Sequence, residues 1–153
     1  MAETGELWIK SVAEAQEFKV EKIGTEDLFL KKDIIGLVVE EKDWKDPVKV
    51  SFNNIYQRGI NGKWYRHNKG QVVKYAFEIK QRDMNKKIYR HIISVYVFSN
   101  LMGRRVQPIY YRKYGTVFVV SKEYFPAWLH SLERTYLGEI SLDSPNMYMG
   151  AIR

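Results

Sequence analysis

Residues 71–98 read QVVKYAFEIKQRDMNKKIYRHIISVYVF, and this stretch decides the predicted fold. In residues 71–82 apolar and mostly charged side chains alternate, and the apolar set is Val73, Tyr75, Phe77 and Ile79. Such alternation is typical of a half-buried strand, because successive side chains of a strand point in opposite directions. Residues 88–98 are rich in β-branched and aromatic side chains and predict a second strand.

Residues 83–87, Asp-Met-Asn-Lys-Lys, separate these two strands and are predicted to form a turn. The stretch therefore predicts a long antiparallel hairpin with about a dozen residues per arm, roughly 40 Å long. The second arm is apolar on both faces, so the sequence leaves the register of the pairing open.

Shorter elements are predicted on both sides of the hairpin. A helix is expected over residues 11–18, because Ser11 with Glu14 three residues later forms a capping box. Apolar runs predict strands at residues 33–41, 48–52, 106–112 and 116–120. Residues 53–70 are rich in Gly and Asn, and they are predicted to be a basic, exposed, turn-rich segment.

A second helix is predicted over residues 121–137, with Pro126 in an early turn and Gly138 as its stop. Its apolar stripe has helical spacing: Phe125, Trp128, Leu129, Leu132 and Tyr136. The predicted fold is α+β, a single domain over residues 1–153. It has an antiparallel sheet with a long central hairpin, a short N-terminal helix and a C-terminal helix packed on the sheet.

Charge is distributed very unevenly along the chain. Residues 47–115 hold fifteen Lys and Arg and two acids, a net charge of +13. The residues before this block carry −5 and those after it carry −1, which gives +7 overall. A block of this kind attracts polyanions, and nucleic acid is the usual one, with DNA favoured here. The competing interpretation is a solvated face that keeps the protein soluble.

Composition excludes several classes of protein. The chain has no cysteine, which rules out disulfides and thiolate zinc sites. It has no apolar run of membrane-spanning length and an acidic start unlike a signal peptide, so an intracellular protein without a membrane partner is expected. Glycine-rich phosphate loops and nucleophile elbows are also missing.

Cations and aromatic side chains are interleaved in the basic block, as in Lys63-Trp64-Tyr65-Arg66-His67. Cations bind phosphate, and exposed rings can stack on unpaired bases. The alternative is that the rings are core or cross-strand pairs. The candidate nucleic-acid-binding residues are Lys74, Arg82, Arg90, Arg104, Arg105, Arg112, Lys113, Trp64 and Tyr65.

A catalytic hypothesis rests on Glu78-Ile79-Lys80 in the first predicted arm, where Glu78 and Lys80 share a strand face. A Glu-x-Lys on a strand resembles the second half of the PD-(D/E)xK nuclease signature. That resemblance implies Mg²⁺ or Mn²⁺ bound by Glu78, with Lys80 assisting an attacking water. The preceding Pro-Asp is missing, and the nearest match is the reversed Asp46-Pro47.

Other acids could serve as a second metal ligand if the fold brought them close: Glu40, Glu41, Asp43 and Asp46. The competing interpretation of Glu78 and Lys80 is a surface ion pair worth a fraction of a kcal/mol. His91, on the second predicted arm, stands near Glu78 in one register and on the opposite face in the other. Near Glu78, it could do acid–base work on a phosphodiester, and His67 is a further candidate.

The chain as a whole is similar in size and texture to the small orphan proteins of filamentous viruses of hot, acidic springs. It shares with them a lack of cysteine, many Tyr, Lys and Ile residues and a basic middle. Among them it resembles a small α+β nuclease whose activity depends on a glutamate. In this chain, Glu78 is the one residue to which that resemblance assigns a role. The resemblance also implies a location in the host cytoplasm.

The expected function is therefore nucleic-acid binding, with hydrolysis of DNA phosphodiester bonds by Glu78, Lys80 and His91. Two alternatives remain open. One is a DNA-binding or packaging protein without catalysis. The other is an adaptor whose basic block meets an acidic protein, including the acidic N-terminal segment of a second copy in a homo-oligomer.

Overall fold

β3 (Ile35–Lys42) is the strand around which the fold is arranged. Its first six residues are all buried, as is typical of a strand covered on both faces. It pairs antiparallel with β2 (Asp27–Lys32) and parallel with β7 (His91–Phe98). The computed structural model describes residues 4–23, 27–42, 45–67, 74, 76, 78 and 91–142.

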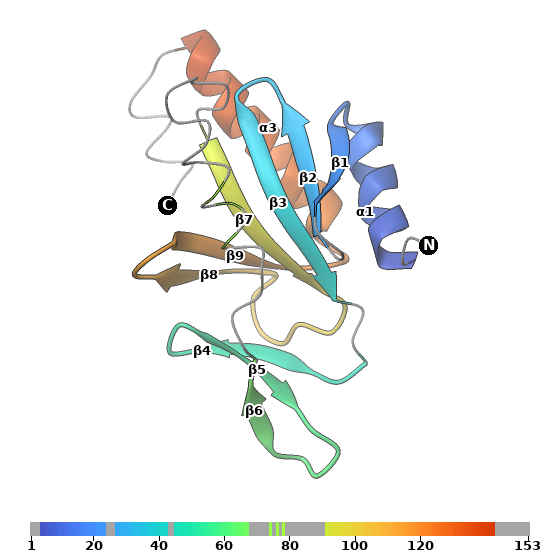
Figure 1. Ribbon diagram of the computed structural model, residues 1–153, viewed down its shortest axis with the longest axis vertical. Coiled ribbons are helices and arrows are strands. Elements are labelled where there is room, and N and C mark those ends of the chain that lie inside the picture. The colour runs from blue at the N-terminus through green and yellow to red at the C-terminus, as the bar shows by residue number, and fades with distance from the viewer. Residues whose placement is uncertain are drawn as a thin grey trace.

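Nine strands form two sheets in the described residues. The larger is a mixed sheet of order β1-β2-β3-β7-β9-β8 (Figure 1), completed by β1 (Lys19–Ile23), β8 (Val106–Tyr111) and β9 (Gly115–Ser121). A second sheet, called the small sheet below, consists of β4 (Val48–Ser51), β5 (Asn54–Arg58) and β6 (Trp64–Arg66). Its strands pair antiparallel in chain order.

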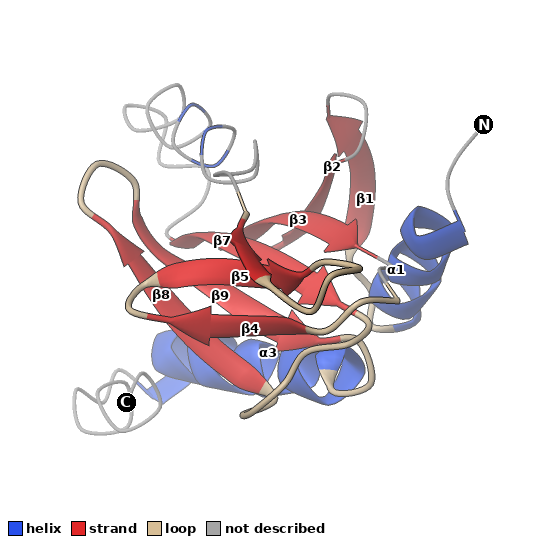
Figure 2. Ribbon diagram, turned by 90° about the horizontal axis from the view of Figure 1, so that it is seen from below, coloured by secondary structure: helices blue, strands red, loops and turns tan. Residues whose placement is uncertain are grey.

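The two faces of the larger sheet are covered by different layers. Helices α1 (Thr4–Ala15) and α3 (Phe125–Leu142) cover one face, where Ile9 and Leu129 pack against strand residues such as Leu37. The small sheet covers part of the other face, where Val48 and Ile55 join the second core cluster. In Figure 2, α3 lies along one side of the larger sheet, and β4 and β5 lie in front of the larger sheet in this view. The fold has three layers.

The predicted α+β class and the C-terminal helix on the sheet are confirmed. Four members of the predicted apolar stripe are buried: Phe125, Trp128, Leu129 and Leu132. The side chain of Tyr136 lies outside the described residues. Ser121 ends β9 and residues 122–124 form the turn before the helix, so α3 begins later than predicted. Neither described helix has the length and apolar character needed to cross a membrane.

The N-terminal helix is confirmed, but it begins earlier than predicted, and Ser11 lies within it rather than at its cap. The carboxylate of Glu41, at the end of β3, lies directly against Gly5 in the first turn, where a Cβ atom would collide with it. A negative charge at this position stabilises a helix through the helix dipole. The negative charge at the start of this helix therefore comes from a distant residue, Glu41.

The predicted central hairpin is wrong. The second arm is present as β7, but both of its edges are occupied by parallel neighbours, β3 and β9. Of the first arm, Lys74, Ala76 and Glu78 are described, and they are helical. Lys74 and Glu78 are exposed and Ala76 is buried. Positions i and i+4 share a helix face and i+2 lies opposite, so this burial pattern fits a helix, whereas in a strand all three side chains would share one face.

Two further expectations change. The sheet is not antiparallel throughout, because β7 runs parallel to both neighbours. Its apolar character on both faces is what an interior parallel strand requires. In residues 53–70 the structure places β5 and β6, joined by a turn in which Gly62 has a φ of 78°. The Gly and Asn residues of this segment correctly predicted the turn, but the strands on either side of it were not predicted.

Candidate nucleic-acid interface

Eight of the fifteen cations of the basic block, together with Lys45 just before it, lie on the small sheet, on the neighbouring β8–β9 hairpin and on the segments that lead into them. Residues 45–67 hold five Lys and Arg and one acid, and residues 99–118 hold four and none. The two segments are in contact: the Val48 N–H donates to the Asn100 carbonyl at 2.9 Å, and the Met102 N–H donates to the Val48 carbonyl at 2.8 Å. We call these nine residues the basic surface: Lys45, Lys49, Arg58, Lys63, Arg66, Arg104, Arg105, Arg112 and Lys113.

Carboxylates do not neutralise this surface. Within the described part of the chain, none of the nine side chains forms an ion pair. Some of them stack on aromatic rings instead. The Lys49 Nζ atom lies 4.2 Å from the centroid of Trp64, and the Lys113 Nζ atom lies 5.3 Å from that of Tyr114. Cations stacked in this way keep their full charge.

A hollow of about 560 Å³ opens between the small sheet and the β8–β9 hairpin. Among the described residues its lining contains no carboxylate, and it consists of Phe52, Asn53, Asn54, Arg66, His67, Tyr110, Tyr111 and Arg112. Arg66 comes from the end of β6 and Arg112 from the turn after β8. Two cations on different walls and no acid make this the part of the surface best suited to an anionic ligand.

The rim of the hollow carries two exposed rings. Phe52 is 93% exposed and Tyr110 is 59% exposed. Phe52 and Asn53 form the two-residue turn between β4 and β5, and their φ angles are 49° and 61°. A positive φ is common for Asn and Gly in such turns but unfavourable for Phe. The turn therefore holds a large apolar side chain in water on a strained backbone.

His67 forms part of the hollow and reaches toward the core. Its ring lies edge-on to Tyr96 at 6.0 Å and to Phe98 at 6.4 Å between centroids. Burial, and in second place the charge of Lys42, lower the pKa of His67 below its ordinary value. The imidazole is therefore neutral at pH 7 and can accept a proton. Burial also raises the pKa of Tyr111, which keeps that phenol neutral.

Behind His67, strand β3 carries a largely buried ion pair. The Lys42 Nζ atom lies 3.2 Å from Oε1 of Glu40, and the two side chains are 19% and 6% exposed. The register places Glu40 between Asp27 of β2 and Tyr96 of β7. Glu40-Glu41-Lys42 is thus another Glu-x-Lys in this chain, and it lies on a strand, whereas Glu78 is helical.

The predicted catalytic residues are not brought together by the described contacts. Glu78 is exposed in a helical segment and forms no ion pair with a described residue, and Lys80 lies outside the described residues. His91 begins β7, opposite Ile35, and its N–H donates to the Ile34 carbonyl at 3.0 Å. No three His, Asp or Glu among the described residues are grouped so that they could hold a metal ion.

The predicted binding residues divide into three groups. Lys74, Arg104, Arg105, Arg112 and Lys113 are exposed, as a phosphate-binding role requires. Arg105 lies 5.6 Å from the ring centroid of Tyr124, at the edge toward α3. Arg82 and Arg90 lie outside the described residues.

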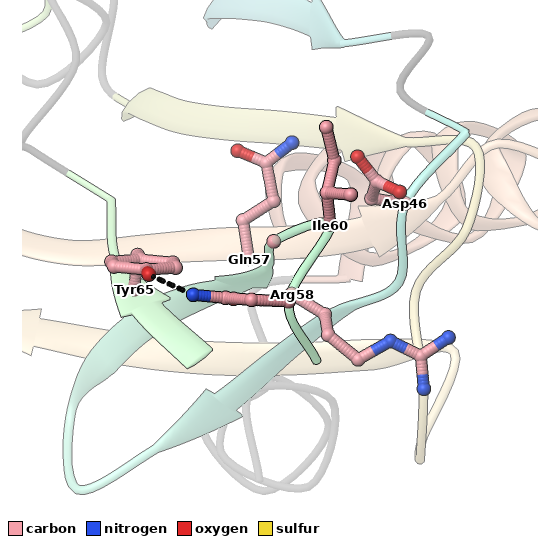
Figure 3. Close-up of a pocket in the computed structure, with 7 residues that line it drawn as sticks. Asp46, Gln57, Arg58, Ile60 and Tyr65 are labelled. Carbon is pink, nitrogen blue, oxygen red and sulfur yellow. Dashed lines mark hydrogen bonds between the residues drawn. The ribbon is translucent and has the colours of Figure 1, made fainter. Parts of the chain in front are cut away.

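The two predicted aromatic residues lie on the β5–β6 hairpin. Trp64 is half-buried beneath Lys49, and Tyr65 is 52% exposed. Tyr65 accepts a hydrogen bond of 2.7 Å from the Asn61 amide (Figure 3), beside a second open hollow of about 550 Å³. In Figure 3 the Arg58 side chain extends away from Tyr65. This hollow includes Asp46, which makes it less favourable for an anion.

Sequence reasoning missed Phe52 and Tyr110 as a pair, and it did not single out Arg66. Arg66 was visible in the run that contains Trp64 and Tyr65, but nothing in the sequence ties it to Arg112, forty-six positions later. No family model, curated protein or solved structure matches this chain.

Proposed function

We propose that the protein binds nucleic acid through the basic surface. The observation that carries this proposal is a set of nine cations on contacting segments without an ion-pair partner among the described residues. A cation left without a carboxylate gives its full charge to a phosphate, and each phosphate contact releases a condensed counterion.

Exposed rings favour nucleic acid over an acidic protein as the partner. Tyr65, Tyr110 and Phe52 stand among the cations. Bases offer faces on which such rings stack, whereas a string of carboxylates does not. DNA remains the favoured nucleic acid, and a non-catalytic packaging role shares the same surface.

The test measures affinity for a labelled DNA fragment at several salt concentrations. We expect the affinity to fall steeply between about 50 and 200 mM salt, with a log–log slope near −0.9 for each phosphate contacted. The variant Arg66→Gln/Arg112→Gln should flatten this slope by about two units. The control Lys10→Gln/Lys19→Gln removes exposed cations from α1 and β1 and should leave the slope unchanged.

Three results would count against the proposal. A salt-independent affinity would reject the phosphate contacts. Equal effects of the two double variants would show that net charge, not this surface, is responsible. Binding to polyglutamate but not to DNA, or salt-sensitive self-association that ignores DNA, would favour the adaptor and the homo-oligomer.

The ion pair behind the hollow favours a second candidate, hydrolysis of the phosphodiester bond. Neutral His67 can take a proton from a water that attacks phosphorus, and the Lys42 ammonium can stabilise the negative charge that develops on the phosphate oxygens. Glu40, 3.2 Å from that ammonium, is a positioning residue. The P–O bond to the leaving oxygen breaks, and that oxygen gains the proton that His67 took from the water.

The cleavage assay uses labelled single-stranded and duplex DNA, with and without Mg²⁺ or Mn²⁺. We expect His67→Gln and Lys42→Met to lose cleavage while keeping DNA binding, and Glu78→Ala to keep both. If Glu78→Ala were the only variant to lose cleavage, the catalytic site would be the one predicted from the sequence, with Glu78 as the ligand of Mg²⁺ or Mn²⁺. Absence of cleavage under all conditions would leave a binding protein.

A further inference from the structure

We infer that the hollow between the small sheet and the β8–β9 hairpin binds one nucleotide of a single strand, with its base stacked on Phe52 or Tyr110 and its phosphates held by Arg66 and Arg112. This inference rests on the proposed function and adds the class of substrate to it. It also concerns a different kind of contact, because rings recognise bases whereas the rest of the basic surface recognises phosphate.

The size of the hollow suits such a unit. Its volume of about 560 Å³ lies within the range of about 300–1,000 Å³ that is usual for sites of small organic ligands. It is open on one side, so a chain can enter and leave without being threaded. Two neighbouring phosphates of a strand lie on either side of each base, and the two arginines stand on different walls.

The strained turn is the strongest sign that the ring of Phe52 is displayed for a ligand. A bulky side chain at positive φ is rare, and backbone strain of this kind clusters at sites of function. The Asn54 amide donates to the Phe52 carbonyl at 3.0 Å, but the ring is almost fully exposed, so among the described residues no packing of the side chain offsets the strain. The Tyr110 N–H is 3.5 Å from Oδ1 of Asn53, so the turn and the second ring are adjacent.

The remaining lining provides hydrogen-bonding groups without charge. The side chains of Asn54, His67 and Tyr111 are of this type, and His67 is neutral at pH 7. Groups of this kind suit the edge of a base, which offers both donors and acceptors. A phosphate alone would use the arginines and leave the rings and amides without a role.

A single strand is favoured because stacking on a protein ring requires a base with a free face. In a duplex both faces of each base are covered by neighbouring bases, so a base cannot stack on a protein ring unless the duplex is locally unstacked. In an unstacked single strand every base has a free face. The hollow therefore adds a preference for single strands to the general attraction of the basic surface for phosphate.

The experiment compares three labelled ligands of equal length: a single-stranded DNA, the matching duplex and a strand made of abasic sites. The single strand and the abasic strand carry the same charge, and the duplex carries about twice as much. We expect the single strand to bind more tightly than the abasic strand. Phe52→Gly or Tyr110→Ala, whichever removes the ring that carries the base, should weaken binding of the single strand by about 5- to 150-fold, the loss of one stacked base, and both variants should leave binding of the abasic strand unaffected. Leu7→Ala removes an exposed apolar side chain from α1 and serves as the control.

The outcomes separate the inference from the function on which it rests. Equal affinity for the single strand and the abasic strand would overturn the nucleotide site, and so would full affinity in both ring variants. Either result would leave the basic surface intact if binding still falls with salt. Failure of all three ligands to bind would overturn both. Phe52→Leu keeps an apolar side chain without the ring, and it should lose the same affinity as Phe52→Gly.

Discussion

The two faces of the large sheet are built on opposite principles. On the helix-covered face, apolar side chains interlock and two ion pairs join the layers: Lys22 with Glu6 at 3.1 Å and Lys122 with Glu41 at 3.6 Å. On the face covered by the small sheet lie an open hollow, exposed rings and cations without carboxylate partners among the described residues, with one largely buried ion pair, Lys42 with Glu40. Residues 4–42 and 119–142 hold eight basic and twelve acidic residues, which sharpens the contrast.

The layers are also attached differently. The helices dock through large buried rings, and the Gln16 amide joins α1 to α3 by donating to the Pro126 carbonyl at 3.0 Å. The small sheet docks through Val48 and Ile55 and through backbone hydrogen bonds to residues 99–102. The free energy of folding is therefore expected to come mainly from the helix layer, which leaves the other layer free to carry strain and unpaired charge.

The largest expected effect is on the helix face. Phe125 is fully buried, and its ring lies 6.0 Å from Trp8 and 6.1 Å from Trp128 between centroids. Phe125→Ala should lower the free energy of unfolding by about 3–5 kcal/mol, measured by urea denaturation. The affinity of the folded fraction for DNA should not change. A loss below about 1 kcal/mol would contradict the assignment of stability to this layer.

A smaller effect is expected from the ion pair on the other face. Glu40→Gln leaves the Lys42 ammonium without its carboxylate in a largely buried position and should cost about 1–3 kcal/mol. Lys42→Met alone should cost a similar amount. The double variant Glu40→Gln/Lys42→Met should cost less than the sum of the two, because neither charge is then left alone. Additive losses in this double-mutant cycle would show that the pair does not interact.

The sequence predicted those parts of this contrast that depend on a local residue pattern, and it did not predict those that depend on contacts between distant segments. The period of 3.6 in Phe125, Trp128, Leu129 and Leu132 identified the helix and its buried face, because packing against a sheet needs that stripe. The same applies to β9, an apolar run between turns. These elements follow from local pattern.

Pairing between distant strands is not encoded locally. β7 was correctly located, but its partners β3 and β9 are far along the chain, and the apolar character of both its faces gave no register. The excess of cations pointed to the basic surface because charge does not depend on the fold. The hollow could not be predicted, since Phe52, Arg66 and Tyr110 meet only through tertiary structure.

The pH dependence of stability tests the environment of His67. Its folded-state pKa lies below its ordinary value through burial and the charge of Lys42, so the unfolded chain binds its proton more readily. The neutral His67 side chain therefore makes its full contribution to the free energy of unfolding above the unfolded-state pKa of about 6.5. This contribution is lost as the pH falls toward the folded-state pKa. His67→Gln should remove this part of the decline between pH 7 and pH 5 in denaturation curves. An identical decline in both proteins would mean that His67 is not desolvated.

The smallest expected effect concerns the strained turn, and its sign is opposite to the others. Phe52→Gly should raise the free energy of unfolding by up to about 1 kcal/mol, because glycine accepts a positive φ at no steric cost and this gain exceeds its greater loss of backbone entropy. The matched change Asn53→Gly should gain nothing, since Asn already tolerates that conformation. If Phe52→Gly is more stable yet binds single-stranded DNA less well, the two faces differ as described: one is optimised for folding, and the other has retained strain for a ligand. Equal shifts in the two variants would remove the case for strain at Phe52.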